Sequence, residues 1–221
     1  MFVATQRGVR LSFAPKKEAF MYCILVSGMP ASGKSTIAQK ISQSLNLPVF
    51  SKDSAKEVLF DTVGFSCRAE KVQLGVAAMR VMYYTAEQMM RANKPFILEN
   101  NFENESVQGI FQLLEKYRYV AITVRLFGDP SVIYQRFAER DLSPERHRGH
   151  VVNDCYPEPA GAVRENPTRK TYAQFLDDIE KRGFTRFVAN GPLLEVDVTD
   201  FSKVNYQELL RKIQLAVNSC N

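Results

Sequence analysis

The segment Tyr22-Cys23-Ile24-Leu25-Val26-Ser27-Gly28-Met29-Pro30-Ala31-Ser32-Gly33-Lys34-Ser35-Thr36 decides the fold of this 221-residue chain. It begins with an uninterrupted apolar run, which is typical of a strand buried on both faces of a parallel sheet. A glycine-containing turn follows, and a helical pattern then continues to about Leu45. A strand joined to a helix in this way begins a βαβ unit, so the segment predicts an α/β fold.

The turn between this strand and this helix fulfils the pattern GxxxxGK[ST], the phosphate-binding loop or P-loop. Its backbone N–H groups can converge on a phosphate, and the helix start adds partial positive charge. Lys34 can reach phosphate oxygens, and the Ser35 hydroxyl can bind Mg²⁺, which takes oxygen ligands. We therefore expect ATP with Mg²⁺ at this loop, with nucleotide contacts from Gly28, Pro30, Ala31, Ser32, Gly33, Lys34, Ser35 and Thr36.

Beyond the P-loop, short apolar runs alternate with longer helical patterns. Further candidate strands lie at 48–51, 96–98, 119–127, 184–189 and 193–198. Strands separated by helices form parallel crossovers, so we expect a P-loop NTPase fold with a five-stranded parallel sheet and helices on both faces. One domain is expected over residues 21–221. Residues 1–20 read as a loose extension, and an organellar transit peptide is the alternative.

Composition indicates one globular domain, because 45% of the residues are hydrophobic and 24% are charged. The net charge is +5, but residues 1–20 carry four basic residues against one acidic residue. The body is therefore only mildly basic, and charge alone does not argue for nucleic acid. The sequence contains no apolar run long enough for a membrane span, and its four scattered cysteines suggest neither disulfides nor zinc. We expect a cytoplasmic protein.

Two other classes of P-loop protein are disfavoured. Asp61-Thr62-Val63-Gly64 imitates the DxxG motif of GTPases, but it follows a helical pattern rather than a strand. Asn93-Lys94 imitates the start of NKxD, but Phe96 stands where the aspartate should be. An AAA+ motor ATPase is disfavoured because no apolar run ends in Asp-Glu and the chain is short.

The loop with proline and alanine before Ser-Gly-Lys resembles that of the small P-loop kinases. Val49–Asp53 resembles the strand-end aspartate motif of polynucleotide 5′-kinases, zeta toxins and chloramphenicol phosphotransferase-like enzymes, and Phe96–Phe102 resembles their third strand. Arg125–Arg140 is similar to the strand and lid helix of nucleoside monophosphate kinases. The resemblance spans about residues 21–215 and best fits predicted-kinase, AAA-domain-like ATP-binding proteins. It implies a nucleoside-monophosphate-kinase-like fold with a lid at about 136–167.

Two acidic residues follow expected strand ends, where open α/β sheets place ligands. Asp53 could accept the proton of an attacking hydroxyl, so we expect it to be a catalytic base that contacts the substrate. We expect the next helix to begin near Ser54, with Ser54 and Glu57 as a capping box. Glu99 could hold a substrate hydroxyl or a magnesium-bound water. Lys34 is expected to act in catalysis by neutralising phosphate charge.

Basic residues cluster in and after the expected lid helix. Arg136 and Arg140 lie four residues apart and share a helix face. Guanidinium groups match the charged oxygens of a phosphoryl-transfer transition state. We expect Arg140 to be catalytic and Arg136 to contact the nucleotide. Arg146 and Arg148 could serve the same purpose from the irregular segment that follows.

Two further features each have two interpretations. His147 and His150 could contact the acceptor or the lid, but a plain surface loop is the simpler account. Met79 and Met82 could face a substrate, but their helical spacing with Val72 and Val76 favours core packing.

The sequence therefore indicates an ATP-dependent kinase that transfers the γ-phosphate to a hydroxyl. A small metabolite, an antibiotic, a nucleoside-like compound and a nucleic-acid 5′-hydroxyl all fit as acceptors. A small molecule is favoured, because the body lacks a basic stripe with interleaved aromatic residues. A nucleotide-binding regulator or ATPase is the alternative, and a toxin-like kinase is a third. No membrane partner is expected, and no oligomeric state is specified.

Overall fold

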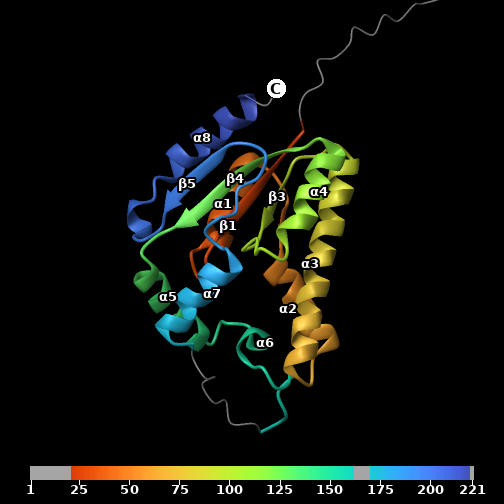
Figure 1. Ribbon diagram of the computed structural model, residues 1–221, viewed down its shortest axis with the longest axis vertical. Coiled ribbons are helices and arrows are strands. Elements are labelled where there is room, and N and C mark those ends of the chain that lie inside the picture. Colours follow the sequence, from red (N-terminus) through yellow and green to blue (C-terminus); the bar gives the residue numbers. More distant parts are fainter. Residues whose placement is uncertain (1–20, 162–169, 220–221) are drawn as a thin grey trace, which may run out of the picture.

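The computed structural model describes residues 21–161 and 170–219 and is built on one parallel sheet (Figure 1). All its strand pairs are parallel, and their spatial order is β2-β3-β1-β4-β5. The predicted five-stranded parallel sheet is thereby confirmed. The strands are β1 (Tyr22–Gly28), β2 (Val49–Ser51), β3 (Phe96–Glu99), β4 (Val120–Phe127) and β5 (Leu193–Asp197).

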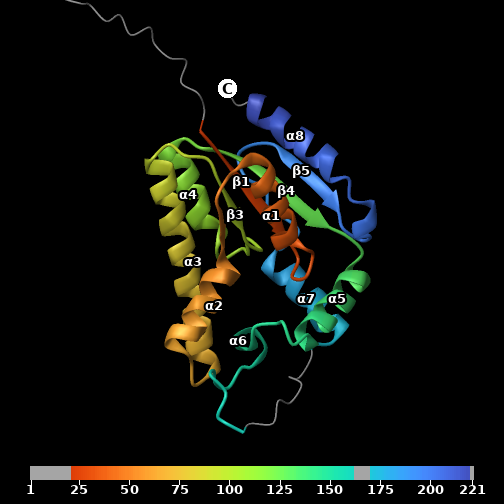
Figure 2. The ribbon, with the colours of Figure 1, turned by 180° about the vertical axis from the view of Figure 1, so that it is seen from behind.

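Helices cover both faces of this sheet (Figures 1 and 2). Side chains from α3 and α4 bury one face, and side chains from α1, α7 and α8 bury the other. The helices are α1 (Lys34–Leu45), α2 (Lys52–Val63), α3 (Arg68–Arg91), α4 (Val107–Tyr117), α5 (Pro130–Leu142), α6 (Arg148–Val151), α7 (Tyr172–Arg182) and α8 (Tyr206–Ser219), with a 3₁₀ turn η1 (Phe201–Lys203).

The central strand β1 is continuously apolar because both of its faces are buried. Ile24 and Val26 belong to the core under α1 and α8, whereas Cys23 and Leu25 belong to the core under α3 and α4. Successive side chains of a strand point to opposite faces, so burial on both faces requires apolar residues at every position.

Two local expectations are wrong. The run Phe184–Ala189 is turn and coil, because β5 takes the place beside β4, starting from the bond between the Thr123 N–H and the Pro192 carbonyl. Helix α2 begins at Lys52 rather than near Ser54, and its cap is Ser51. The expected extension over residues 1–20 lies outside the described residues.

The carboxyl ends of the strands point toward α6, which lies below the sheet between α5 and the α2–α3 pair (Figure 1). We call residues 143–161, which include α6, the strap. Its end is tied to the α2–α3 turn by paired backbone hydrogen bonds of 2.8 Å between Phe65 and Tyr156. The expected irregular lid thus contains a short helix and a bridge, while its last residues, 162–167, lie outside the described part. Among the described helices, none combines the length and apolar character that a membrane span requires.

Candidate active site

A cleft of about 590 Å³ opens at the carboxyl ends of the strands. The P-loop, the start of α2, the end of β3, α5 and the strap all contribute side chains to it. Gly28 and Ser32, which were expected to contact the nucleotide, are not part of its lining. The expected site residues that line it are Pro30, Ala31, Gly33, Lys34, Ser35, Thr36, Asp53, Glu99, Arg136 and Arg140.

The P-loop backbone follows a path that favours glycine. Ala31 and Gly33 have φ values of 63° and 81°, in the left-handed region. At Gly28 the φ value is 142°, and a Cβ atom would lie 2.6 Å from the Leu126 carbonyl oxygen. Ser32 is buried, and its hydroxyl has no hydrogen-bond partner among the described residues. This tight turn leaves the N–H groups at the start of α1 directed at the cleft.

Lys34 brings a positive charge to the centre of the cleft. Its side chain is buried, and Nζ donates to the Met29 carbonyl at 2.9 Å. Burial lowers the pKa of Lys34, whereas the charges of Glu99 and Asp53 raise it. The amine and the two carboxylates therefore act on one another across the cleft.

This donor set fits a nucleoside triphosphate with Mg²⁺. Lys34 Nζ donates to the Met29 carbonyl within its own loop, and Ser35 lines the cleft. Among the described residues, no group of three His, Cys, Asp or Glu side chains could hold a metal ion by itself. Mg²⁺ is often bound by few protein oxygens together with substrate phosphates, so Ser35 is the residue that would hold it here.

Asp53 lies in the first turn of α2, immediately after β2. It is exposed to the cleft, and it is not the helix cap, because Ser51 accepts that hydrogen bond from the Ser54 N–H. Burial raises the pKa of the Asp53 carboxyl, but the positive charges around it, those of Arg146, Lys34 and Lys56 among them, outweigh this effect. The net pKa lies below the ordinary value, so the side chain is an anion at neutral pH.

The end of β3 supplies a second carboxylate and an amide. Glu99 is the last residue of β3, is buried and lines the cleft. Asn100 follows it, and its buried Nδ2 has no hydrogen-bond partner among the described residues. Sequence reasoning assigned no role to Asn100, although its position directly after a strand end was the available signal.

Arg136 lines the cleft, but its two terminal nitrogens already donate hydrogen bonds within the protein. The two terminal nitrogens donate to the carbonyl oxygens of Val198 and Thr199 at 2.5 and 2.7 Å. Its guanidinium also lies 4.3 Å from the ring centre of Phe201. That ring covers the P-loop so closely that a Cβ atom on Gly33 would lie 2.5 Å from it. Arg136 therefore fixes the segment that lies over the P-loop.

The strap places a third arginine in the cleft. Arg140 contacts Asp141 at 3.2 Å, and Arg146 lies 3.8 Å from the same carboxylate. The Arg146 side chain is only 16% exposed, and its Nε has no hydrogen-bond partner among the described residues. Arg148 instead pairs with Glu158 at 2.6 and 2.7 Å and does not line the cleft. Sequence reasoning did not separate Arg146 from Arg148.

The two histidines of the strap have different surroundings. His150 lines the cleft, and its Nε2 lies 2.9 Å from Oε1 of Glu57. Burial lowers the pKa of His150, so its imidazole is neutral at physiological pH. The Nδ1 of His147 accepts the Gly149 N–H, so its Nε2 carries the proton that bonds Asp61 at 3.0 Å. The surface-loop interpretation is therefore wrong for His150.

A side pocket of about 200 Å³ adjoins the cleft between α2, α3 and α7. Lys52, Lys56, Glu103 and Arg182 line both spaces, so the two are continuous. Met79 lines the side pocket, whereas Met82 is in the core. Core packing is therefore confirmed for Met82, and it also holds for Met89 and Met90 of the same helix, whereas Met79 borders a pocket.

Comparisons with known proteins agree with this architecture. The family model described as "AAA domain" matches residues 23–154. A search of curated proteins gives no match. A solved structure from Chloroflexus aurantiacus J-10-fl, described as a "putative kinase", is 26% identical, with a TM-score of 0.73 over 88% of this chain and 97% of that chain.

Two more distant structures show similarity in fold alone. The gluconokinase from Sinorhizobium meliloti 1021 is 14% identical, with a TM-score of 0.51 over 91% of this chain and 97% of its own. The shikimate kinase from Bacteroides thetaiotaomicron is 13% identical, with a TM-score of 0.50 over 89% of this chain and 98% of its own. With the family match covering more than half of its length, the chain belongs to the AAA domain family and has the fold of the small P-loop kinases.

Proposed function

We propose that this protein is an ATP-dependent phosphotransferase that moves the γ-phosphate of ATP to a hydroxyl of a small molecule. The observation that carries the proposal is the meeting of Asp53, an anion exposed to the cleft, with the P-loop lysine Lys34. Arg140 and Arg146 line the same space. Phosphoryl transfer requires a base beside a phosphate-binding loop and positive charges that stabilise the transferring group.

The residues support the following reaction. Asp53 accepts the proton of the acceptor hydroxyl, whose oxygen then forms a bond to the γ-phosphorus. The bond between that phosphorus and the β,γ-bridging oxygen breaks, and ADP leaves. Lys34, Arg140 and Arg146 neutralise the charge on the transferring group. Asp53 then releases its proton to solvent, to which it is exposed.

Three further residues complete the site. Ser35 would hold Mg²⁺, which when bound neutralises phosphate charge. Glu99 orients the acceptor hydroxyl or a water from the end of β3. The Arg136 guanidinium acts on the nucleotide indirectly, through the Phe201 segment.

A small-molecule acceptor is favoured over a nucleic-acid 5′-hydroxyl. The structural neighbours named as a gluconokinase and a shikimate kinase support it by analogy of fold. A nucleotide-binding regulator that phosphorylates nothing is the second candidate. The cytoplasmic location stays a prediction.

The test is transfer from γ-labelled ATP to pools of hydroxyl compounds, including 5′-hydroxyl oligonucleotides. Asp53→Asn should reduce transfer about 10²- to 10⁴-fold, while the Kd for ATP stays within about twofold. Asp177→Asn is the matched control, because Asp177 is an exposed residue of α7 that pairs with Lys181. Unchanged turnover in Asp53→Asn would remove Asp53 as the base. ATP binding without transfer to any pool would favour the regulator.

A further inference from the structure

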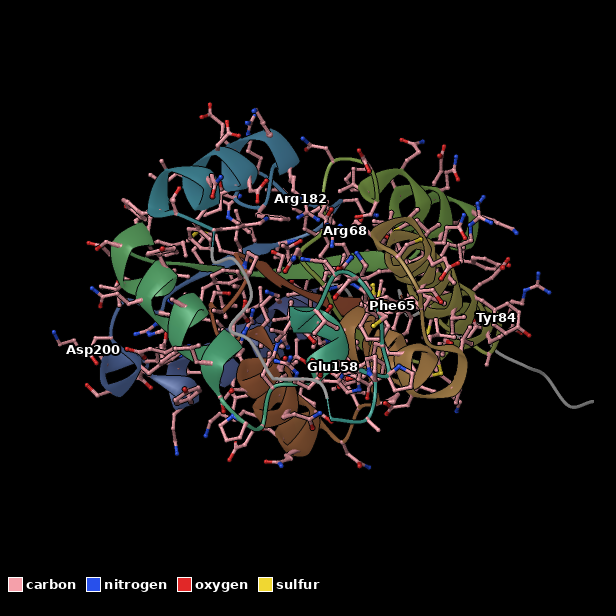
Figure 3. The ribbon with its side chains drawn as sticks, turned by 90° about the horizontal axis from the view of Figure 1, so that it is seen from below. Phe65, Arg68, Tyr84, Glu158, Arg182 and Asp200 are labelled. Atoms are coloured by element: carbon pink, nitrogen blue, oxygen red, sulfur yellow. The ribbon has the colours of Figure 1, made fainter. Side chains whose placement is uncertain are left out.

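The side pocket belongs to the acceptor end of the site rather than to the nucleotide end. No P-loop residue lines it, whereas Lys52, Lys56 and Arg182 connect it to the cleft. Figure 3 looks onto this end of the molecule and shows Arg68 and Arg182 close together, although they come from α3 and α7. The phosphates of a nucleotide on the P-loop therefore leave the charges of this pocket unmatched.

Two of the cations in the pocket share one carboxylate. Lys52 lies 3.6 Å from Glu103, and Arg182 bonds the other oxygen of Glu103 at 2.5 Å. Glu103 thus neutralises only part of the charge that these two residues bring.

The other three cations, Lys56, Arg68 and Lys71, have no carboxylate within 4.0 Å among the described residues, and Lys71 donates to the His150 carbonyl. The Lys56 stem crosses α3 at Gly75, where a Cβ atom would lie 3.5 Å from its Cε, and Nζ lies 5.2 Å from the Phe60 ring centre. Arg68 donates to the neutral amide oxygen of Asn153 at 2.8 Å. Burial and the charges of Lys52, Arg68 and Arg146 lower the pKa of Lys56, against the opposing effect of Asp53. An anion between Lys56 and Arg68 would relieve this repulsion.

Part of the α3 wall of the pocket is apolar. Val72, Val76 and Met79 line it from α3, at a spacing that puts them on one helix face. Val72 is 51% exposed and Val76 is 42% exposed, so these side chains have room to contact a ligand. Along α3 the pocket therefore passes from the cations Arg68 and Lys71 to aliphatic surface, while Glu105 adds a carboxylate to its lining.

We propose that the acceptor is a small organic alcohol bearing an oxyanion, a carboxylate or a phosphate, that binds between Lys56 and Arg68. Its carbon skeleton lies against Val72 and Val76, and its hydroxyl extends toward Asp53. The identification of this ligand as the acceptor rests on the proposed kinase function, whereas the oxyanion site itself does not. The size of the side pocket suits a small molecule.

The oxyanion site can be tested with inorganic sulfate as the probe. The protein is first saturated with Mg²⁺ and a non-hydrolysable ATP analogue, so that the P-loop is filled. Sulfate stabilises most proteins nonspecifically, so the decisive quantity is the difference between wild type and variants. Relative to chloride at equal ionic strength, sulfate at ten times its Kd should raise the Tm of wild type by about 3 °C more than that of the variants.

The variants are Lys56→Met and Arg68→Met, which keep much of each aliphatic stem. Arg80→Met is the matched control, because Arg80 is an exposed residue of α3 outside both pockets. The extra shift should vanish in the first two variants and persist in the control. An equal shift in all four proteins, or no extra shift in wild type, overturns the oxyanion site.

The acceptor assignment is tested with sets of alcohols that share a skeleton, such as glycerol, glycerate and glycerol 3-phosphate. Labelled phosphate should go to an anionic member, and Lys56→Met should raise its KM at least about tenfold. Whichever of glycerate and glycerol 3-phosphate accepts phosphate more efficiently shows whether the acceptor's oxyanion is a carboxylate or a phosphate. Equal transfer to the neutral alcohol, or transfer to 5′-hydroxyl oligonucleotides alone, overturns the proposal. A sulfate effect without any transfer would overturn the kinase function and leave the oxyanion site.

Discussion

The Nζ of Lys71 donates a hydrogen bond to the main-chain carbonyl oxygen of His150 at 2.8 Å. Lys71 lies on α3 and is 3% exposed, and it also bonds the Val152 carbonyl and the Asn153 side-chain oxygen. One buried amine thereby holds the strap that presents Arg146 and His150 to the cleft. If the strap were loose, Arg146 would no longer be held in place in the cleft. Lys71 should therefore affect the site although it does not line the cleft.

Lys71 should make stability depend on pH. Burial, with the charges of Lys56, Arg68 and Arg146, lowers the pKa of Lys71 from 10.5 to about 7. Between about pH 7 and pH 10, the unfolded chain therefore holds a proton that the folded protein has released. The free energy of unfolding should rise with pH in this window, and Tm should increase by up to about 3 °C per pH unit. Below about pH 7, Lys71 should make no contribution to the change of Tm with pH.

Lys71→Met should abolish this increase, as measured by Tm against pH for both proteins. The methionine keeps an aliphatic stem but has no titrating group. Identical slopes in wild type and Lys71→Met between pH 7 and pH 9 would show that the amine keeps an ordinary pKa in the folded protein.

The fold was predictable where the pattern is local. The run in β1 followed by the P-loop predicts a buried parallel strand and its helix, and both are present. The run Phe184–Ala189 misled because Phe184 and Phe187 anchor a loop into the cores on opposite faces of the sheet. Apolar residues that anchor a loop in the core leave much the same sequence pattern as a short strand. Helix α6, with four residues, is too short to show a period.

The candidate site was predictable in part. Asp53 and Glu99 follow neighbouring parallel strands, whose carboxyl ends share one edge, so their meeting with Lys34 follows from topology. The choice between Arg146 and Arg148 depends on the path of the strap. That path is set by contacts distant in sequence, such as the bridge from Phe65 to Tyr156, and no local pattern encodes it.

Gly149 allows α6 to rest directly on α2. A Cβ atom at this position would lie 2.3 Å from the Phe60 ring, which is buried. Gly149→Ala should therefore lower the free energy of unfolding by about 1–3 kcal/mol and Tm by several degrees. Gly75→Ala is the control, because its Cβ would make ordinary contact and alanine favours the helix. Equal Tm values for the two variants in thermal melts would contradict this packing.

Arg136 should affect nucleotide affinity through the segment it holds. Arg136→Gln removes the hydrogen bonds to Val198 and Thr199 and the stacking on Phe201. The Phe201 ring should then leave its place over Gly33, and the Kd for ATP should rise about tenfold. Calorimetric titration with ATP gives this value, and Phe201→Ala should reproduce it. A weakened affinity in Arg136→Gln but not in Phe201→Ala would instead indicate direct contact between the arginine and the nucleotide.

Arg146 should contribute more to turnover than its neighbour in the strap. Its largely buried guanidinium lines the cleft, and its Nε makes no hydrogen bond among the described residues, so Arg146→Ala should lower kcat about 10²- to 10³-fold. Arg146→Lys should restore little, because an ammonium cannot reproduce planar, two-pronged donation. Arg148→Ala removes the same charge from a residue that pairs with Glu158, and it should leave kcat nearly unchanged. Steady-state kinetics with the identified acceptor compare the three. If Arg148→Ala proved as damaging as Arg146→Ala, the arginines would act by holding the strap in place, because only one of them faces the cleft.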